Sequence, residues 1–520
     1  MLKITNIPQE EKISELYDIR LNGTPVKANF ARVSAMPFNC IWPNHQRVLE
    51  QTEEAAFINF AMSEPVEMEV TVEKEFQEAV VRPLHDGIVP QVVGDTIKFT
   101  IEKPGQYTLE LDSWHNALHI FANPVCDYGV CPEDENVIYF PAGVHHPGVI
   151  ELQSNQTLYI DKDAVVYGAV IAVQAENIKI LGDGILDGSW EERNNQSILV
   201  PVDQLRRNPR WDIYSPILKG HPSIDPVYPV KGSKLLQDKE EFSAFLKKGN
   251  YLYSCIHIYE CQNILIQGVT LRDASGFTVL PANCENLTID NIKIVGNWRY
   301  NSDGVDFFNC RNSVLKNSFL RCFDDCVVLK GMPGWDTWSM ENLLIENCVV
   351  WCDWGATLEI GAETCAPEYR NIIFRDCDCI HNTGAAMRVH HCDRAKVHNL
   401  IYDDIRAEYS KYDLGMTYQN SDDMVYEPYY HQPTFALACF DGETYFSNDK
   451  LKGSIDGVTY RNIKVYDDVG EKVPPIRFEG YNAEHTVSHV TIDGLYYNGQ
   501  KITDESVIST NEFASDICLK

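Results

Sequence analysis

Three aspartates in a short central stretch are the residues of this chain most suited to chemistry. Asp303 lies in the segment NSDGVD, and Asp324 and Asp325 form a pair at the start of DDCVVLK. Carboxyl groups that lie close together cannot all ionise freely, because like charges raise the pKa of at least one of them. Glycoside hydrolysis requires such an unequal pair, in which an acid protonates the leaving oxygen and an ionised partner acts on water or on the anomeric carbon.

A repeated six-residue pattern indicates how these aspartates are positioned. Four residues of alternating polarity, flanked by Asn, Gly or Asp, predict a short half-buried strand that enters a tight turn, where Asn tolerates the left-handed conformation. Successive central copies start 23 to 30 residues apart, which is room for three short strands and their turns. The nine copies begin at Asn177, Asn263, Asn286, Asn312, Asn342, Asn371, Arg394, Gly457 and His489.

The repeat predicts an all-β fold whose main part is a right-handed parallel β-helix, a solenoid in which each coil buries its core only against its neighbours. We assign residues 126–520 to this solenoid, with insertions rich in Pro, Trp and Tyr at about 189–255 and 409–452. Residues 1–125 lack the repeat and show short alternating runs, which predict a β-sandwich domain.

Stacked coils lie about 4.7–4.9 Å apart, so Asp303 and the aspartate pair are expected on neighbouring coils. For a single aspartate at a turn, capping of backbone amides would be the better interpretation; an aspartate followed one coil later by a pair favours catalysis. Further polar residues of the same strands are expected to bind substrate: Asn301, Asp306, Lys330, Glu359, Arg388, His390 and His391.

A calcium site is the alternative use of such a carboxylate cluster, since hard cations collect oxygen ligands. It would suit a polysaccharide lyase, with Arg388 or Lys330 as the proton abstractor. The sequence has no Asx-rich ligand loop, so we predict no bound metal and no organic cofactor.

Charge and cysteine content limit the partners and the compartment. The chain has 75 acidic and 44 basic residues, a net charge of −31 that opposes binding to nucleic acid or an anionic membrane. The first twenty residues have no apolar stretch typical of a secretory signal, and 17 cysteines, an odd number, favour a reducing compartment and buried thiols. We expect a cytoplasmic protein whose partners are its oligosaccharide or glycoside substrate and, if it assembles, copies of itself.

The solenoid from Val137 to Gly494 resembles glycoside hydrolase family 28, the polygalacturonases and their relatives. NSDGVD is similar to that family's Asn-Thr-Asp motif, DDCVVLK to its Asp-Asp-Cys motif, and YFPAGVHHPG and QTLYIDKDAVVYGA to its first coils. The resemblance implies that Asp324 is the general acid and that Asp303 and Asp325 orient water in an inverting mechanism. The first domain, with its LHIFANP exit, resembles family 49, the dextranase-type relatives.

Two departures from the family bear on the substrate. Polygalacturonases carry Gly-His-Gly where this chain has Gly355-Ala356-Thr357, and Arg-Ile-Lys where it has Arg388-Val389-His390. Without the lysine that pairs with a galacturonate carboxylate, a small neutral oligosaccharide or glycoside, cleaved in exo fashion, is the expected substrate. The alternatives are a galacturonate oligosaccharide, the calcium-dependent lyase, or a non-catalytic carbohydrate-binding solenoid, which would be favoured if any of the three aspartates pointed into the solenoid interior.

Overall fold

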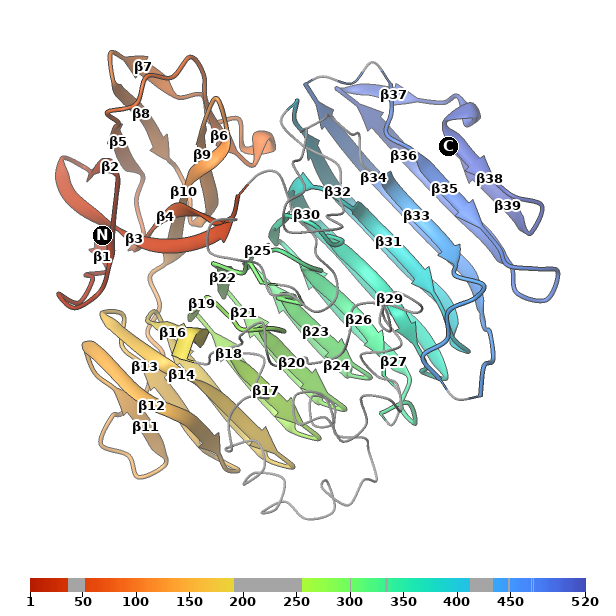
Figure 1. The fold of residues 1–520 in the computed structure, drawn as a ribbon, viewed down its shortest axis with the longest axis horizontal. Coiled ribbons are helices and arrows are strands. Elements are labelled where there is room, and N and C mark those ends of the chain that lie inside the picture. The colour runs from red at the N-terminus through yellow and green to blue at the C-terminus, as the bar shows by residue number, and fades with distance from the viewer. Residues whose placement is uncertain are drawn as a thin grey trace, which may run out of the picture.

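The computed structural model describes residues 1–35, 52–190, 255–299, 301–332, 335–411, 434–447, 449–468, 470 and 472–520. Within these ranges the chain forms two β-sheet units, drawn from red to blue in Figure 1. The predicted insertions at 189–255 and 409–452 fall largely outside the described residues. No helix in the described ranges has the length and apolar character needed to cross a membrane.

The first unit is one ten-stranded sheet in the order β6-β9-β10-β4-β3-β2-β5-β8-β7, with β1 paired to β4. Residues from β2 through β10 share one hydrophobic core, so the sheet curves around it. The predicted all-β fold class is confirmed, and the strands predicted as a β-sandwich form one continuous sheet. Its elements are β1 (Leu2–Ile4), β2 (Ile13–Leu21), β3 (Thr24–Ser34), β4 (Thr52–Met62), β5 (Val66–Thr71), β6 (Ala79–Arg82), the 3-10 turn η2 (Leu84–Asp86), β7 (Gln91–Val93), β8 (Thr96–Ile101), β9 (Gly105–Leu111) and β10 (Ser113–Pro124).

The second unit is the predicted parallel β-helix, whose coils add one strand to each of three faces. The face that carries the aspartates, called the site sheet below, starts with β12 (Gly143–Leu152) and β14 (Ala164–Val173). It continues through β17 (Ile256–Tyr259), β20 (Val279–Ala282), β23 (Val305–Phe308), β26 (Val327–Gly331), β29 (Leu358–Thr364), β31 (Ala385–His391), β33 (Thr434–Phe440), β35 (Ile476–Glu479) and β38 (Ile508–Thr510).

The strands of the repeated motif stack on a second face, called the ladder sheet. They are β11 (Val137–Phe140), β13 (Thr157–Ile160), β15 (Glu176–Gly182), β18 (Gln262–Gln267), β21 (Glu285–Asp290), β24 (Arg311–Lys316), β27 (Met340–Glu346), β30 (Glu368–Asn382), β32 (Lys396–Tyr409), β34 (Ser454–Asp467), β36 (Val487–Tyr497) and β39 (Ala514–Leu519).

The third face consists of β16 (Ile185–Asp187), β19 (Thr270–Arg272), β22 (Lys293–Val295), β25 (Phe319–Cys322) and β28 (Val349–Cys352), and continues into the second halves of the long ladder strands. The hairpin strand β37 (Gln500–Ile502) and the 3-10 turns η3 (Gly188–Trp190) and η4 (Glu505–Val507) complete the described elements.

Alternation along each short strand builds the solenoid core. In β18, Ile264 and Ile266 point inward and are buried, while the intervening residues face outward. The twelve cysteines from Cys255 to Cys392 are buried free thiols, as the repeat predicted. They fill inward positions beside the turns as small apolar side chains.

An asparagine ladder runs along the edge of the ladder sheet. Its members have left-handed φ angles, for example 57° at Asn342, and their side-chain amides donate to side chains of the preceding coil. Asn342 donates to Asn312 (2.8 Å), Asn371 to Asn342 (3.0 Å) and Asn399 to Asn371 (2.6 Å). Asn312 itself donates to the Glu285 carboxylate (2.9 Å). The Asn-rich repeat is therefore a column of coil-to-coil hydrogen bonds.

The first sheet packs mainly against the third face of the solenoid and also contacts the start of β14 through Val165. Apolar residues of the first sheet such as Trp114 and Phe121 share a core with Phe319 and Trp351. Arg82 pairs with Glu110 of the first sheet and with Glu408 of the solenoid at 2.8 and 2.5 Å.

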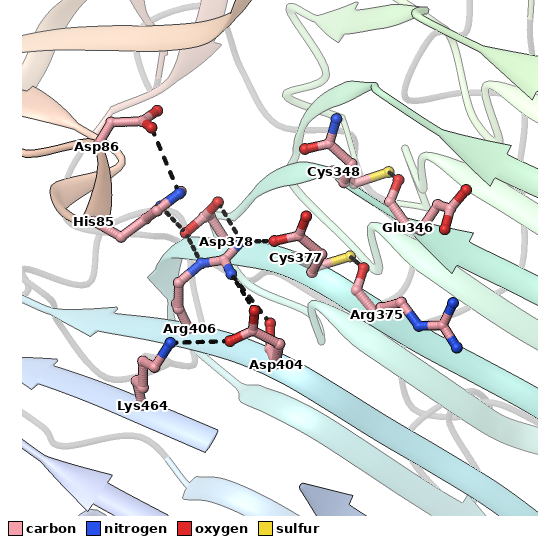
Figure 2. Close-up of polar contacts among 12 residues, drawn as sticks. His85, Asp86, Glu346, Cys348, Arg375, Cys377, Asp378, Asp404, Arg406 and Lys464 are labelled. Carbon is pink, nitrogen blue, oxygen red and sulfur yellow. Dashed lines mark hydrogen bonds and ion pairs between the residues drawn. The ribbon is translucent and has the colours of Figure 1, made fainter. Parts of the chain in front are cut away.

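A second polar contact lies at the edge of this junction. Figure 2 shows the His85 ring against Asp378, which Arg406 also holds. The His85 Nδ1 atom lies 2.8 Å from Asp378 Oδ1, and Arg406 donates to both oxygens of Asp378 at 2.6 and 2.9 Å.

Candidate active site

The three aspartates lie where the chain passes from the third face into the site sheet, at the start of β23 and β26. Val305 pairs with Val327 in parallel register, so Asp303 lies directly opposite Asp325 on the next coil. The amide of Gly304 donates to the Asp325 carbonyl (2.8 Å) and fixes this stacking. One carboxylate oxygen from each of Asp303, Asp324 and Asp325 lies within 4.8 Å of the others. The predicted grouping on neighbouring coils is therefore present.

The carboxylates project from the outward side of the solenoid wall. In β23 and β26 the core residues are Val305, Phe307, Val327 and Leu329. The alternate residues Asp306 and Lys330 thus face away from the core, on the side where the aspartates gather. Asp303, Asp324 and Asp325 are only 2, 5 and 4% exposed, so the carboxyl groups are largely removed from water without entering the solenoid interior.

Gly355 and Ala356, which replace the Gly-His part of the family motif, position Asp325. The Ala356 amide donates to Asp325 Oδ1 at 2.8 Å. A Cβ atom on Gly355 would lie 2.6 Å from the same oxygen and 2.5 Å from the Asp325 amide nitrogen. The missing side chain of Gly355 is therefore required for the observed position of Asp325.

Lys330 lies at the centre of the carboxyl cluster. Its Nζ atom is 3.5 Å from Asp303, 3.6 Å from Asp325, 3.6 Å from Glu363 and 3.8 Å from Asp306. Burial by itself would lower the pKa of Lys330, but the surrounding carboxylates outweigh it and raise the pKa well above its ordinary value. Lys330 thus carries a fixed positive charge among four carboxyl groups.

One ammonium cannot neutralise four carboxylates, so the cluster retains protons. Burial, followed by the charges of Asp306 and Asp324, raises the pKa of Asp303 well above its ordinary value, and Lys330 opposes the shift. Burial raises the pKa of Asp306 in the same way, again against Lys330. The directions of these pKa shifts favour protons on Asp303 and Asp306 beside a charged Lys330, an arrangement suited to acid–base chemistry.

Arg388 closes one side of the cluster from the strand β31. Its guanidinium donates two hydrogen bonds to Glu359, at 2.8 and 2.6 Å, and a longer one to Asp325 at 3.4 Å. Burial raises the pKa of Glu359 to about 8, an effect that the Arg388 charge opposes. The register places Glu359 and Arg388 opposite each other on adjacent coils.

The remaining predicted residues differ in their positions. His390 lies two residues beyond Arg388 on the same side of β31, with its Nε2 atom 3.9 Å from Asp441. Asn301 has a left-handed φ of 54° in the turn before Asp303.

The structure does not bring His391 to the cluster. Odd-numbered residues of β31 face the solenoid core, so His391 is fully buried and bonds through Nε2 to the Ala395 carbonyl at 2.7 Å. Burial lowers its pKa to about 4.

Two acidic residues of this region were not predicted from the sequence. Glu363 reaches Lys330 because the pairing of β26 with β29 shifts register between Leu329 and Gly331, which inserts extra residues into β29. Asp441 directly follows β33 and lies beside His390. Neither belongs to a recognisable motif, and only the order of the coils could have indicated their positions.

The stretch of the chain that contains this site matches the model of a known protein family. Residues 238–424, which contain all three aspartates and Arg388, match the model of "Glycosyl hydrolases family 28". A "Probable polygalacturonase" of Vitis vinifera is 22% identical over 236 residues, 44% of this chain and 44% of that protein. A "Polygalacturonase" of Brassica napus is 32% identical over 101 residues, 19% of this chain and 23% of that protein. The chain thus spans less than half the length of these curated relatives.

The fold also has a relative that extends over both units. Dex49A from Penicillium minioluteum covers 99% of this chain and 96% of its own, with a TM-score of 0.62 at 13% identity. These comparisons confirm the predicted resemblance, to family 28 in the solenoid and to the family 49 type in the arrangement of both units. The match of residues 238–424 to this family is a reason to propose glycoside hydrolase activity.

Proposed function

We propose that this chain, with its family 28 active-site motifs, is an inverting, exo-acting hydrolase of a small neutral oligosaccharide or glycoside. The observation that carries the proposal is the grouping of Asp303, Asp324 and Asp325, whose carboxylate oxygens lie within 4.8 Å of one another. Free buried thiols support the cytoplasmic location that we include in the proposal.

In the proposed reaction Asp324 gives its proton to the glycosidic oxygen as the bond to the anomeric carbon breaks. A water molecule held by Asp303 and Asp325 attacks that carbon, and its proton passes to this pair. The roles follow the family 28 resemblance, and the facing positions of Asp303 and Asp325 on adjacent coils suit a shared water ligand. Lys330, 3.5 and 3.6 Å from Asp303 and Asp325, favours the ionised form of the pair and so opposes the burial that raises the pKa of Asp303.

Replacing each aspartate by asparagine tests the assignment. Each of Asp303→Asn, Asp324→Asn and Asp325→Asn should lower kcat by about 10² or more, the range of general acid–base catalysis. Turnover would be followed on a panel of aryl glycosides and short oligosaccharides. Asp290→Asn, on the ladder sheet, is the matched control and should leave kcat unchanged. Near-normal turnover in all three site variants would contradict the assignment and favour a non-catalytic carbohydrate-binding solenoid.

Stereochemistry tests the inverting mechanism. Inverting enzymes usually separate their two carboxyl groups by about 6.5–9.5 Å and retaining enzymes by about 5–5.5 Å, while the oxygens here lie within 4.8 Å. We nevertheless expect inversion. A pair of carboxylates, Asp303 and Asp325, would hold the water, so the usual separation between one acid and one base need not apply. NMR during early turnover would report the anomer, and retention would make one aspartate a nucleophile.

The proposal that the substrate is neutral depends on His390 and its neighbour Asp441. Where polygalacturonases carry a lysine, this chain has a histidine 3.9 Å from a carboxylate. A uronate carboxylate bound there would meet the negative charge of Asp441. In metal-free enzyme kcat/KM should therefore be higher for a neutral glycoside than for the matched uronate, and His390→Lys should narrow the difference. A preference of the wild type for the uronate would restore a galacturonate oligosaccharide as substrate.

A calcium-dependent lyase is the second candidate, but Lys330 disfavours it. The ammonium lies 3.5 and 3.6 Å from Asp303 and Asp325, where a cation shared by these carboxylates would have to bind. Added Ca²⁺ should not raise the rate, and the product should contain no unsaturated sugar ring. A calcium-stimulated, unsaturated product would identify the lyase.

A further inference from the structure

We propose that His390, Cys392 and Asp441 bind one divalent transition-metal ion, for which zinc is the best fit. The three residues lie at the end of β31 and just after β33, beyond Arg388 and apart from the aspartate cluster. One ligand atom of each, an imidazole nitrogen, the Sγ atom and a carboxylate oxygen, lies within 4.8 Å of the other two.

The solenoid wall positions the three ligands. His390 and Cys392 are two residues apart and project to the same side of the extended chain. Because His391 pairs with Phe440, the next residue, Asp441, is level with Cys392 on the adjacent coil. The Asp441 amide donates to the His391 carbonyl at 3.0 Å and holds this register.

The separations suit a zinc ion with small side-chain adjustments. Zinc bonds of about 2.0–2.3 Å in tetrahedral geometry place ligand atoms roughly 3.3–3.8 Å apart. His390 Nε2 and Asp441 Oδ2 already lie 3.9 Å apart. Three protein ligands leave a fourth position for water, and the 24 and 36% exposed side chains of His390 and Asp441 give an ion access from solvent.

Surrounding hydrogen bonds orient the ligands, as outer contacts do in metal sites. Asp441 Oδ1 accepts from the amides of Glu443 and Thr444, both at 3.1 Å, and the Thr444 hydroxyl donates to Oδ2 at 2.6 Å. Lys452 donates to the carbonyls of Cys392 and Asp441, both at 2.5 Å, and so ties the loop after β33 to the end of β31.

The chemistry of the donors selects the class of metal. A thiolate and a carboxylate together cancel the charge of a divalent ion, while a sulfur ligand disfavours Ca²⁺ and Mg²⁺. The aspartate cluster offers only oxygen atoms and already contains Lys330. Binding releases the thiol proton of Cys392 to solvent as the metal–sulfur bond forms.

Titration of metal-free, fully reduced protein with zinc chloride tests the site. Calorimetry should give one zinc ion per chain with release of a proton, and the Tm should rise. Cobalt(II) bound in place of zinc should show a thiolate-to-cobalt charge-transfer band. None of these measurements depends on glycosidase activity, so their failure is distinct from failure of the proposed function.

Cys392→Ser should abolish the charge-transfer band, and His390→Ala and Asp441→Asn should each weaken zinc binding by at least about tenfold. Cys131→Ser, which removes an exposed thiol, is the control and should bind zinc as the wild type does. Asp441→Asn changes a partly exposed side chain, so it tests the site even if the buried Cys392 variant fails to fold. Absence of stoichiometric binding in the wild type, or unchanged binding in Asp441→Asn and His390→Ala, would overturn the proposal.

Discussion

At the scale of single residues, Lys330 decides how the carboxyl cluster divides into protonated and ionised members. Four carboxylates surround its ammonium within 3.8 Å. Removing the positive charge therefore raises the pKa of each neighbouring carboxyl group, since an opposite charge nearby favours the ionised form.

Lys330→Met should lower kcat by at least roughly tenfold and move the acidic limb of the kcat/KM profile to higher pH. The limb moves upward because the base must lose a proton that it now holds more tightly. Lys330→Arg, which keeps the charge, should leave the limb near its wild-type position. An unmoved limb in a folded Lys330→Met enzyme would show that the ammonium does not control the base.

The motif residues of this site could be predicted from the sequence, and the others could not. The positions of Asp303, Asp324 and Asp325 could be predicted because adjacent coils align residues that are about one repeat apart. His391 was predicted to bind substrate together with His390. Alternate residues of a strand face opposite sides, so His390 faces outward and His391 faces the core. Glu363 was missed because an irregular register cannot be read from spacing.

At the scale of elements, the asparagine ladder explains why the solenoid was predictable. Each rung needs both a left-handed residue and an amide that donates and accepts, and asparagine satisfies both requirements. The sequence therefore repeats asparagine at one position per coil. The insertions predicted between coils show no such repeat in the sequence, and their bounds stay a prediction.

Substitution at Asn342 separates the two roles of a rung. Asn342→Ala places an ordinary residue at a φ of 57° and removes two side-chain hydrogen bonds, so we expect a loss of about 2 kcal/mol in the free energy of unfolding. Asn342→Gly keeps the conformation and should cost only about 1 kcal/mol. Urea unfolding compares the two, and equal losses would show that backbone conformation contributes nothing.

At the scale of the whole molecule, the junction of the two units joins residues far apart in sequence. The packing of the first sheet on the third face could not be predicted, because its contacts, such as Arg82 with Glu408, follow no repeat. The His85 contact with Asp378 makes part of this junction depend on pH. The hydrogen bond to Asp378 raises the pKa of His85, while burial and Arg406 oppose the shift and Asp86 adds to it.

Because the pKa of His85 is raised in the folded state, its stabilisation is fully present below the unfolded pKa of about 6.5 and is lost as pH rises through the folded value. His85→Ala should therefore cost roughly 1–2 kcal/mol at pH 5.5 and clearly less at pH 8.5. Thermal unfolding at both pH values measures the difference. His145→Ala, which removes a histidine whose Nε2 atom bonds to the Pro141 carbonyl rather than to a carboxylate, is the control. An equal cost at both pH values would contradict the assignment.

The contact between Asn312 and Glu285 has a consequence for the electrical polarity of the column above it. An ionised carboxylate can only accept, so Asn312 must turn its NH₂ group toward Glu285 and its oxygen toward Asn342. Each later amide must have the same orientation. If one amide turned over alone, two NH₂ groups or two oxygens would face each other. Their dipoles therefore add along the axis as far as Asn399, where the next coil offers only Gly457. Glu285 thus sets the direction of the amides from Asn312 to Asn399, and Glu285→Gln would remove this constraint on their orientation.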